Sequence, residues 1–149
     1  MKKFVFVFFL LLSSSYATPV PEQLDDAKLE IMRLDLTNRR EKALTLCDES
    51  LKKWPNHPGL YSQKGIMLSR LGRDQEALES LNLAIKFDEH PSGVVFFEKG
   101  QVLEAFGQLE EALKNYKLAI EHGHDDRWVY FAIAGVERKL CEEKKKEMR

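Results

Sequence analysis

The side chains in this sequence that could do chemistry are its histidines, its two cysteines and its many carboxylates. The histidines are His57, His90, His122 and His124. Only His122 and His124, with the following Asp125 and Asp126, place several metal-ligand types close together. A structural zinc normally needs four ligands in a closed geometry, and the other histidines are expected roughly 10 Å away, one helix-packing distance. We therefore expect polar turn residues and no metal, and a metal-dependent regulator or enzyme is the least favoured alternative.

Motifs for catalysis are missing from the sequence. It contains no phosphate-binding glycine loop, no His-Glu-x-x-His zinc pair and no Gly-x-Ser-x-Gly nucleophile turn. We predict that the protein is not an enzyme and needs no cofactor.

The two cysteines are expected to be unpaired. Cys47 lies within an apolar helical pattern, where it reads as a small buried residue. Cys141 lies on a charged helix end, where we expect it to be half-buried. Four predicted helices separate their two helices, so the distance should exceed the ~7 Å Cα limit for a disulfide.

The first 17 residues have the layout of a secretory signal peptide. Lys2 and Lys3 precede nine apolar residues, Phe4 to Leu12, and the small residue Ala17 closes the segment. A membrane anchor is the alternative, but a spanning helix needs about 20 apolar residues. We predict cleavage after Ala17, a linker over 18–22 and export to the periplasm or the medium. The lack of an Asn-x-Ser/Thr glycosylation signal favours a bacterial setting.

The charge of the chain is balanced. Lys and Arg number 23 against 24 Asp and Glu, which gives a formal charge of -1. No overall field attracts the protein to nucleic acid or to an anionic membrane, so we expect neither as a partner after the signal segment is removed.

An internal repeat runs through the rest of the chain. Gly72 to Ile85 aligns without gaps on Gly107 to Ile120, 35 residues further on, and seven of the fourteen positions are identical. A weaker copy lies upstream, where Ala43 precedes Ala77 by 34 residues. A period of this length is typical of helical repeat proteins.

These positions resemble the tetratricopeptide repeat (TPR) family. The second copy carries Tyr61, Gly65, Leu68, Gly72, Ala77, Leu81 and Ala84. The third carries Phe96, Gly100, Leu103, Gly107, Ala112, Tyr116 and Ala119. The first carries Leu34, Ala43, Cys47, Ser50 and Pro55, with Ile31 where the family has glycine. The resemblance implies an all-α, right-handed α-solenoid of antiparallel helix pairs, with repeats at about 24–57, 58–92 and 93–126 and a capping helix over 127–146.

Helical spacing explains the same pattern in physical terms. Gly65, Ala77 and Ala84 are small, so that two helices can approach closely, while apolar residues at spacings of three and four fill the seam between them. Gly72, Gly107 and Gly123 suit helix C-termini. The predicted helices are 23–36, 40–53, 58–71, 74–87, 94–106, 109–122 and 127–146.

The resemblance also implies a concave groove, lined by the first helix of each hairpin, that receives peptide segments. The residues expected to face it are Lys28, Met32, Asp35, Ser62, Ile66, Ser69, Arg70, Phe97, Gln101 and Glu104. Met32, Ile66 and Phe97 would form an apolar stripe beside Lys28 and Arg70, suited to a segment with hydrophobic anchors and some acid. Packing of this stripe against the capping helix is the alternative.

The resemblance does not extend to every family function. The TPR subgroup that clamps a C-terminal carboxylate uses Lys and Asn at set groove positions, and this chain has Met32, Ile66 and Gln101 where the asparagines are expected. We predict an exported, non-catalytic scaffold or adaptor that binds a protein or peptide. The alternative is a self-associating structural protein of the cell envelope, a homo-oligomer in which segments 94–97 and 128–131 pack against another copy.

Overall fold

The computed structural model describes residues 23–148, and this part of the chain consists of seven α-helices joined by short turns. The helices are α1 (Leu24–Leu36), α2 (Arg40–Lys53), α3 (Pro58–Arg70), α4 (Asp74–Phe87), α5 (Gly93–Ala105), α6 (Leu109–Glu121) and α7 (Arg127–Glu147). Each predicted helix is present, with ends that differ by at most one residue. The predicted signal segment and linker lie outside the described residues.

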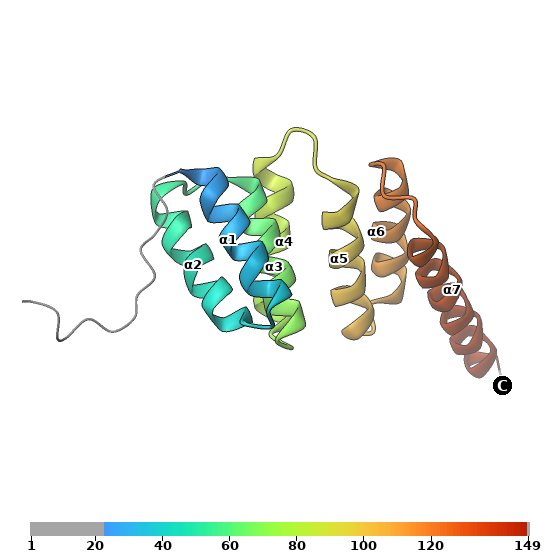
Figure 1. Ribbon diagram of the computed structural model, residues 1–149. Helices are drawn as coiled ribbons and strands as arrows, with labels where there is room; N and C mark the ends of the chain where they lie inside the picture. The colour runs from blue at the N-terminus through green and yellow to red at the C-terminus, as the bar shows by residue number, and fades with distance from the viewer. Residues whose placement is uncertain (1–22, 149) are drawn as a thin grey trace, which may run out of the picture.

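The helices form three successive hairpins and a final single helix. Figure 1 shows them side by side in a row, with the α1–α2 hairpin at one end and α7 at the other. Each helix packs on the next along the chain, and α3 also contacts α1 and α5. The predicted fold class, an all-α stack of helix pairs with a C-terminal helix, is confirmed.

Turn residues set the ends of these helices. Gly72, Gly107 and Gly123 have φ of 73°, 74° and 82°, as predicted for helix C-termini. In the first hairpin Asn38 takes the same role with φ of 59°, because asparagine tolerates the left-handed region better than most residues. Asp126 caps α7, since its carboxylate accepts hydrogen bonds from Trp128 N and Val129 N at 2.9 and 3.2 Å.

The small residues let the two helices of a hairpin meet. A Cβ on Gly65 would lie 2.7 Å from Leu81 Cγ, and one on Gly100 would lie 2.5 Å from the Tyr116 ring. Both glycines therefore accept a large side chain from the partner helix. In the first hairpin the sizes are exchanged, because the larger Ile31 and the smaller Cys47 lie in one buried cluster. This exchange explains how the first hairpin packs without the family glycine.

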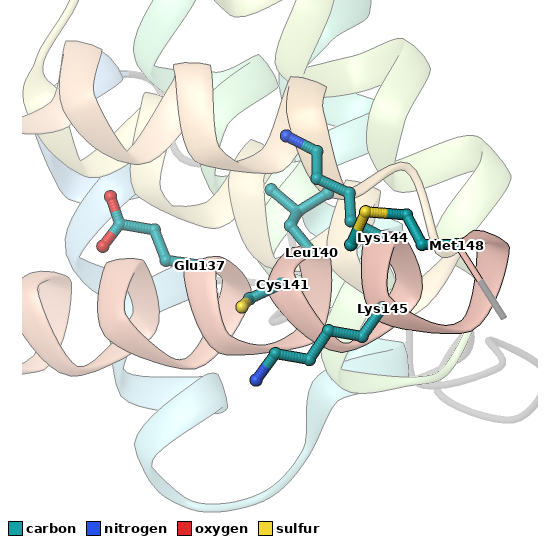
Figure 2. Close-up of a pocket in the computed structure, with 6 residues that line it drawn as sticks. All are labelled: Glu137, Leu140, Cys141, Lys144, Lys145 and Met148. Atoms are coloured by element: carbon teal, nitrogen blue, oxygen red, sulfur yellow. The ribbon is translucent and has the colours of Figure 1, made fainter.

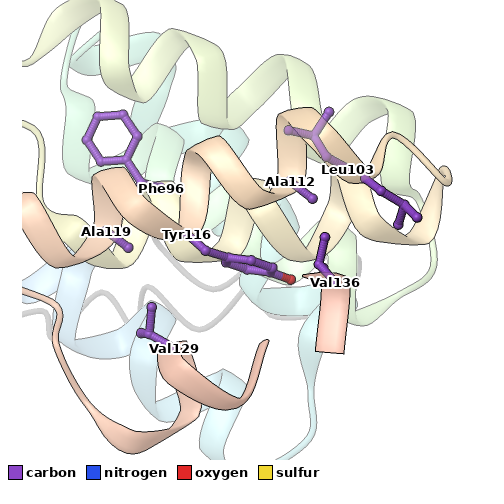
Figure 3. Packing of buried hydrophobic residues seen from close by; sticks show 8 residues of the cluster. Phe96, Leu103, Ala112, Tyr116, Ala119, Val129 and Val136 are labelled. Carbon is purple, nitrogen blue, oxygen red and sulfur yellow. The ribbon is translucent and has the colours of Figure 1, made fainter. Parts of the chain in front are cut away.

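The last hairpin and α7 share one core. Tyr116 is fully buried among Phe96, Leu103, Ala112 and Ala119, as seen in Figure 3. Val129 and Val136 of α7, which are also fully buried, close this core from the outside. The N-terminal half of α7 thus covers the third hairpin as predicted.

Both cysteines are free in the structure. Cys47 is buried as expected, and burial raises the pKa of its thiol to about 12, so very little reactive thiolate forms near neutral pH. Cys141 is exposed rather than half-buried. The prediction was wrong there because Cys141 lies in the C-terminal half of α7, five residues beyond Val136, the last fully buried side chain of the helix. None of the helices in residues 23–148 is both long and apolar enough to span a membrane.

Candidate functional site

Helix α7 continues the register of α3 and α5. Leu60 and Met67 of α3 correspond to Val95 and Val102 of α5, which lie 35 residues further on. All four are buried. The buried residues of α7, Val129 and Val136, follow Val95 and Val102 by 34 residues. By this register α1, α3, α5 and α7 form a series, which we call the inner helices, and Trp128 and Phe131 of α7 correspond to Val94 and Phe97 of α5.

The predicted charged residues at the α1–α3 end are paired within the chain. Asp35 forms ion pairs with Arg70 and with Arg40, the latter at 3.3 Å between Nε and Oδ1. Lys28 lies 3.2 Å from Asp25. Ser62 and Ser69 are half-buried on the same helix as Arg70. At this end of the predicted groove Lys28 and Arg70 are therefore each paired with a carboxylate, and Asp35 is shared by two guanidinium groups.

The predicted apolar stripe is exposed only in part. Met32 is 49% exposed. Ile66 is half-buried against the cluster of the first hairpin. Phe97 is half-buried, with its ring centroid 5.6 Å from that of Tyr116 and 5.2 Å from that of His124. Ile66 and Phe97 therefore pack partly inside the domain, Ile66 on the cluster of the first hairpin and Phe97 on Tyr116 and His124, whereas the alternative named the capping helix.

Glu104 is tied to the inner surface by two contacts. Tyr116 donates its hydroxyl to Glu104 Oε2 and Lys139 donates to Oε1, each at 2.7 Å. Burial raises the pKa of this carboxyl, but the hydrogen bonds from Lys139 and Tyr116 and the charge of Lys139 together lower it below its ordinary value. Its neighbour in the predicted groove, Gln101, is exposed.

The α5–α7 pocket is the hollow that the two inner helices form beside this point, with a volume of about 520 Å³. It is lined by Val94, Phe97, Glu98, Gln101, His124, Asp126, Trp128, Phe131 and Ala132. Trp128 and Phe131 are 65% and 62% exposed, and their ring centroids lie 6.2 Å apart. Large exposed aromatic rings beside a hollow are typical of a protein-binding surface.

Glu98 is the acidic group of this pocket that lacks a partner. Its side chain is half-buried, and no hydrogen bond or ion pair joins it to another residue in the range 23–148. Burial raises the pKa of its carboxyl, an effect that Arg70 and His124 reduce.

The sequence reasoning placed Phe97 and Gln101 at this site but missed Glu98, Trp128 and Phe131 as groove residues. The 34-residue register from Val94 to Trp128 and from Phe97 to Phe131 was the signal that could have identified the two rings. Glu98 had no such signal, because the aligned residues, Gln63 and Ala132, are not acidic.

A second hollow, of about 460 Å³, lies along the end of α7. Figure 2 shows Glu137, Leu140, Cys141, Lys144, Lys145 and Met148 along it. All of these residues belong to α7 or, in the case of Met148, directly follow it, so no second element encloses a ligand there.

The histidines considered for metal binding have other surroundings. His122 packs on the Phe96 ring with centroids 4.6 Å apart, and His124 Nε2 lies 3.7 Å from Asp126 Oδ2. Across residues 23–148, no group of three or more His, Cys, Asp or Glu could hold a metal ion.

The fold defines a class, that of helical-repeat proteins built from stacked helix hairpins. Residues 58–91 and 95–121 match the family model described as "Tetratricopeptide repeat". The α3–α4 and α5–α6 hairpins are therefore similar to tetratricopeptide repeats, and the α1–α2 hairpin has the same two-helix architecture. Proteins built from this repeat are typically non-catalytic scaffolds. A comparison with curated proteins finds no match to the chain.

Solved TPR domains share the fold at low sequence identity. The first TPR domain of the human RPAP3 protein is 18% identical, with a TM-score of 0.73 over 80% of this chain and 93% of that one. The Sgt2 TPR domain from Aspergillus fumigatus is 20% identical, with a TM-score of 0.74 over 81% of each chain. The first TPR of Spaghetti (RPAP3), solved with the HSP90 peptide SRMEEVD, is 18% identical, with a TM-score of 0.73 over 78% of this chain and 91% of that one.

Proposed function

We propose that this protein is a non-catalytic scaffold that binds a peptide segment of a partner along its inner helices, with the α5–α7 pocket as the main anchor point. The observation that carries the proposal is the pair of exposed rings, Trp128 and Phe131, beside a hollow of about 520 Å³. Aromatic residues dominate the binding energy of many protein interfaces. The solved complex of the similarly folded Spaghetti domain with an HSP90 peptide supports this mode of binding.

A selection from random twelve-residue peptides displayed on phage tests the proposal. We expect enriched peptides whose affinity falls about 30-fold on Phe131→Ala, because truncating an interface hot spot costs about 2 kcal/mol or more. Tyr130→Ala is the matched control, since Tyr130 is an exposed aromatic residue of the same helix that does not line the pocket. Synthetic peptides and fluorescence anisotropy give the affinities.

Two outcomes contradict this prediction. If no peptide is enriched over background, the inner helices do not bind peptides in the proposed way. If light scattering instead finds a dimer that Phe131→Asp dissociates, the exposed rings serve self-association, the second candidate, which their exposure also favours.

We further propose that the protein is exported, on the basis of the signal-like residues 1–17. Expression in a bacterium with an active secretion system should give a mature protein that begins at Thr18. The intact mass of the purified protein measures this directly. A mass that retains Met1 to Ala17 in the exported fraction means that the segment is not cleaved.

A further inference from the structure

Glu98 lines the α5–α7 pocket, and its carboxylate has no ion-pair partner among residues 23–148. The basic residues that act most on this carboxyl are Arg70 and His124, but the Arg70 guanidinium is bound to Asp35 and His124 lies beside Asp126. A half-buried carboxylate that has lost part of its hydration gains most from a ligand that brings a positive charge or a strong hydrogen-bond donor.

The aromatic rings around Glu98 suit the same kind of ligand. The faces of Trp and Phe rings attract ammonium and guanidinium groups, and Trp128 already has the Arg127 guanidinium 5.9 Å from its ring centroid. Val94 and Ala132 also line the pocket. An arginine or lysine side chain would pack its apolar stem on such residues while its charged end reaches the carboxylate.

The basic residues that were expected to attract an acidic ligand are already paired within the chain. The two basic residues predicted to attract acid, Lys28 and Arg70, are held by Asp25 and Asp35. Lys139 of α7 is paired with Glu104 of α5 at 2.7 Å. An acidic peptide would have to break these ion pairs to bind Lys28, Arg70 or Lys139, whereas a basic peptide meets Glu98, which has no ion pair among residues 23–148.

We propose that the α5–α7 pocket selects a basic side chain, arginine or lysine, in the bound peptide, with Glu98 as its counter-ion and Phe97, Trp128 and Phe131 as the apolar walls. This inference rests on the proposed peptide binding and specifies the chemistry of its ligand. It differs from the acidic preference that Lys28 and Arg70 indicated in the sequence, because each of those residues is already paired with a carboxylate.

Synthetic versions of the phage-selected peptides test this assignment. We expect arginine or lysine to be enriched among the selected sequences. Replacing the enriched arginine by citrulline, which has the same shape without the charge, should weaken binding at least tenfold. With Glu98→Gln the arginine and citrulline peptides should bind within about twofold of each other, because the carboxylate that distinguishes them is gone.

Controls keep this result separate from unfolding. Glu98→Gln breaks no ion pair, so its melting temperature should match or exceed that of the parent protein. Glu79→Gln, an exposed carboxylate on α4 outside the pocket, should leave the tenfold preference intact. Selected peptides that need Phe131 but show no basic enrichment, or no response to Glu98→Gln, overturn this inference and leave the proposed function standing. A selection without any enriched peptide overturns both.

Discussion

Tyr116→Ala is expected to lower the free energy of unfolding by about 3–5 kcal/mol, the usual cost of removing a fully buried aromatic side chain. Tyr116 is 0% exposed and lies at the centre of the cluster that joins α5, α6 and α7. Its ring packs directly on the backbone of α5 at Gly100. Truncation therefore leaves a cavity that closes only if α5 and α6 move together. Chemical denaturation followed by circular dichroism measures the loss.

Tyr116→Phe separates the ring from its hydroxyl. This change keeps the packing and removes only the hydrogen bond to Glu104, so we expect a loss of about 1–3 kcal/mol. The pKa of Glu104 is lowered in the folded state, so its contribution to stability is present at neutral pH and is lost as pH falls below the ordinary glutamate value of 4.5. The phenylalanine variant should therefore lose less stability than the parent over that acid range. Equal losses for Tyr116→Ala and Tyr116→Phe would mean that the ring does not support the core.

The hairpin architecture could be predicted from the sequence because small residues recur in step. The positions of Gly100 and Ala112 in the third repeat carry Gly65 and Ala77 in the second. The residue that packs on the glycine is Leu81 in the second repeat and Tyr116 in the third. Each hairpin is a local structure with neighbours close in sequence, so the period of the apolar pattern suffices to place its helices. This is why the predicted helix ends agree with the structure to within one residue.

The candidate site was less accessible to the same reasoning. Helix α7 has Ala134 where α5 has Gly100, so it lacks the repeat's glycine. Its apolar residues are also explained by a capping role. The sequence pattern therefore gave little indication that α7 aligns with α5. The ion pairs of the inner surface depend on which long side chains reach across between hairpins, as Arg70 does to Asp35 over 35 residues, and no short-range pattern encodes that choice. A prediction made without these ion pairs overestimates the positive charge that the surface offers to a ligand.

The first hairpin shows that the close contact between the two helices of a hairpin can be made by more than one pair of residues. It uses Ile31 on one helix and Cys47 on the other, whereas the third hairpin uses Gly100 and Tyr116. Both pairs combine a large residue with a small one at equivalent positions. If the shapes of the two side chains govern the packing, replacing both members of one pair by those of the other should be tolerated better than replacing one member alone.

Gly100→Ile alone should cost about 3 kcal/mol of folding free energy, because its Cβ would lie 2.5 Å from the Tyr116 ring and overpacking of this kind forces backbone shifts. Gly135→Ile is the matched control, a glycine in the interior of α7 whose added Cβ would meet no heavy atom within 4 Å. There the better helix propensity of isoleucine should raise stability by a few tenths of a kcal/mol. Thermal and urea unfolding of both variants give the comparison.

The double variant Gly100→Ile with Tyr116→Cys transfers the pair of the first hairpin into the third. Tyr116→Cys alone leaves a cavity, and Gly100→Ile alone creates a clash, but the isoleucine can occupy the space that the tyrosine ring vacates. We therefore expect the double variant to be more stable than the sum of the single losses predicts, by about 1–3 kcal/mol in a double-mutant cycle. Strict additivity would show that Gly100 and Tyr116 do not share one contact, and the size-exchange explanation for the missing glycine of the first hairpin would then be wrong.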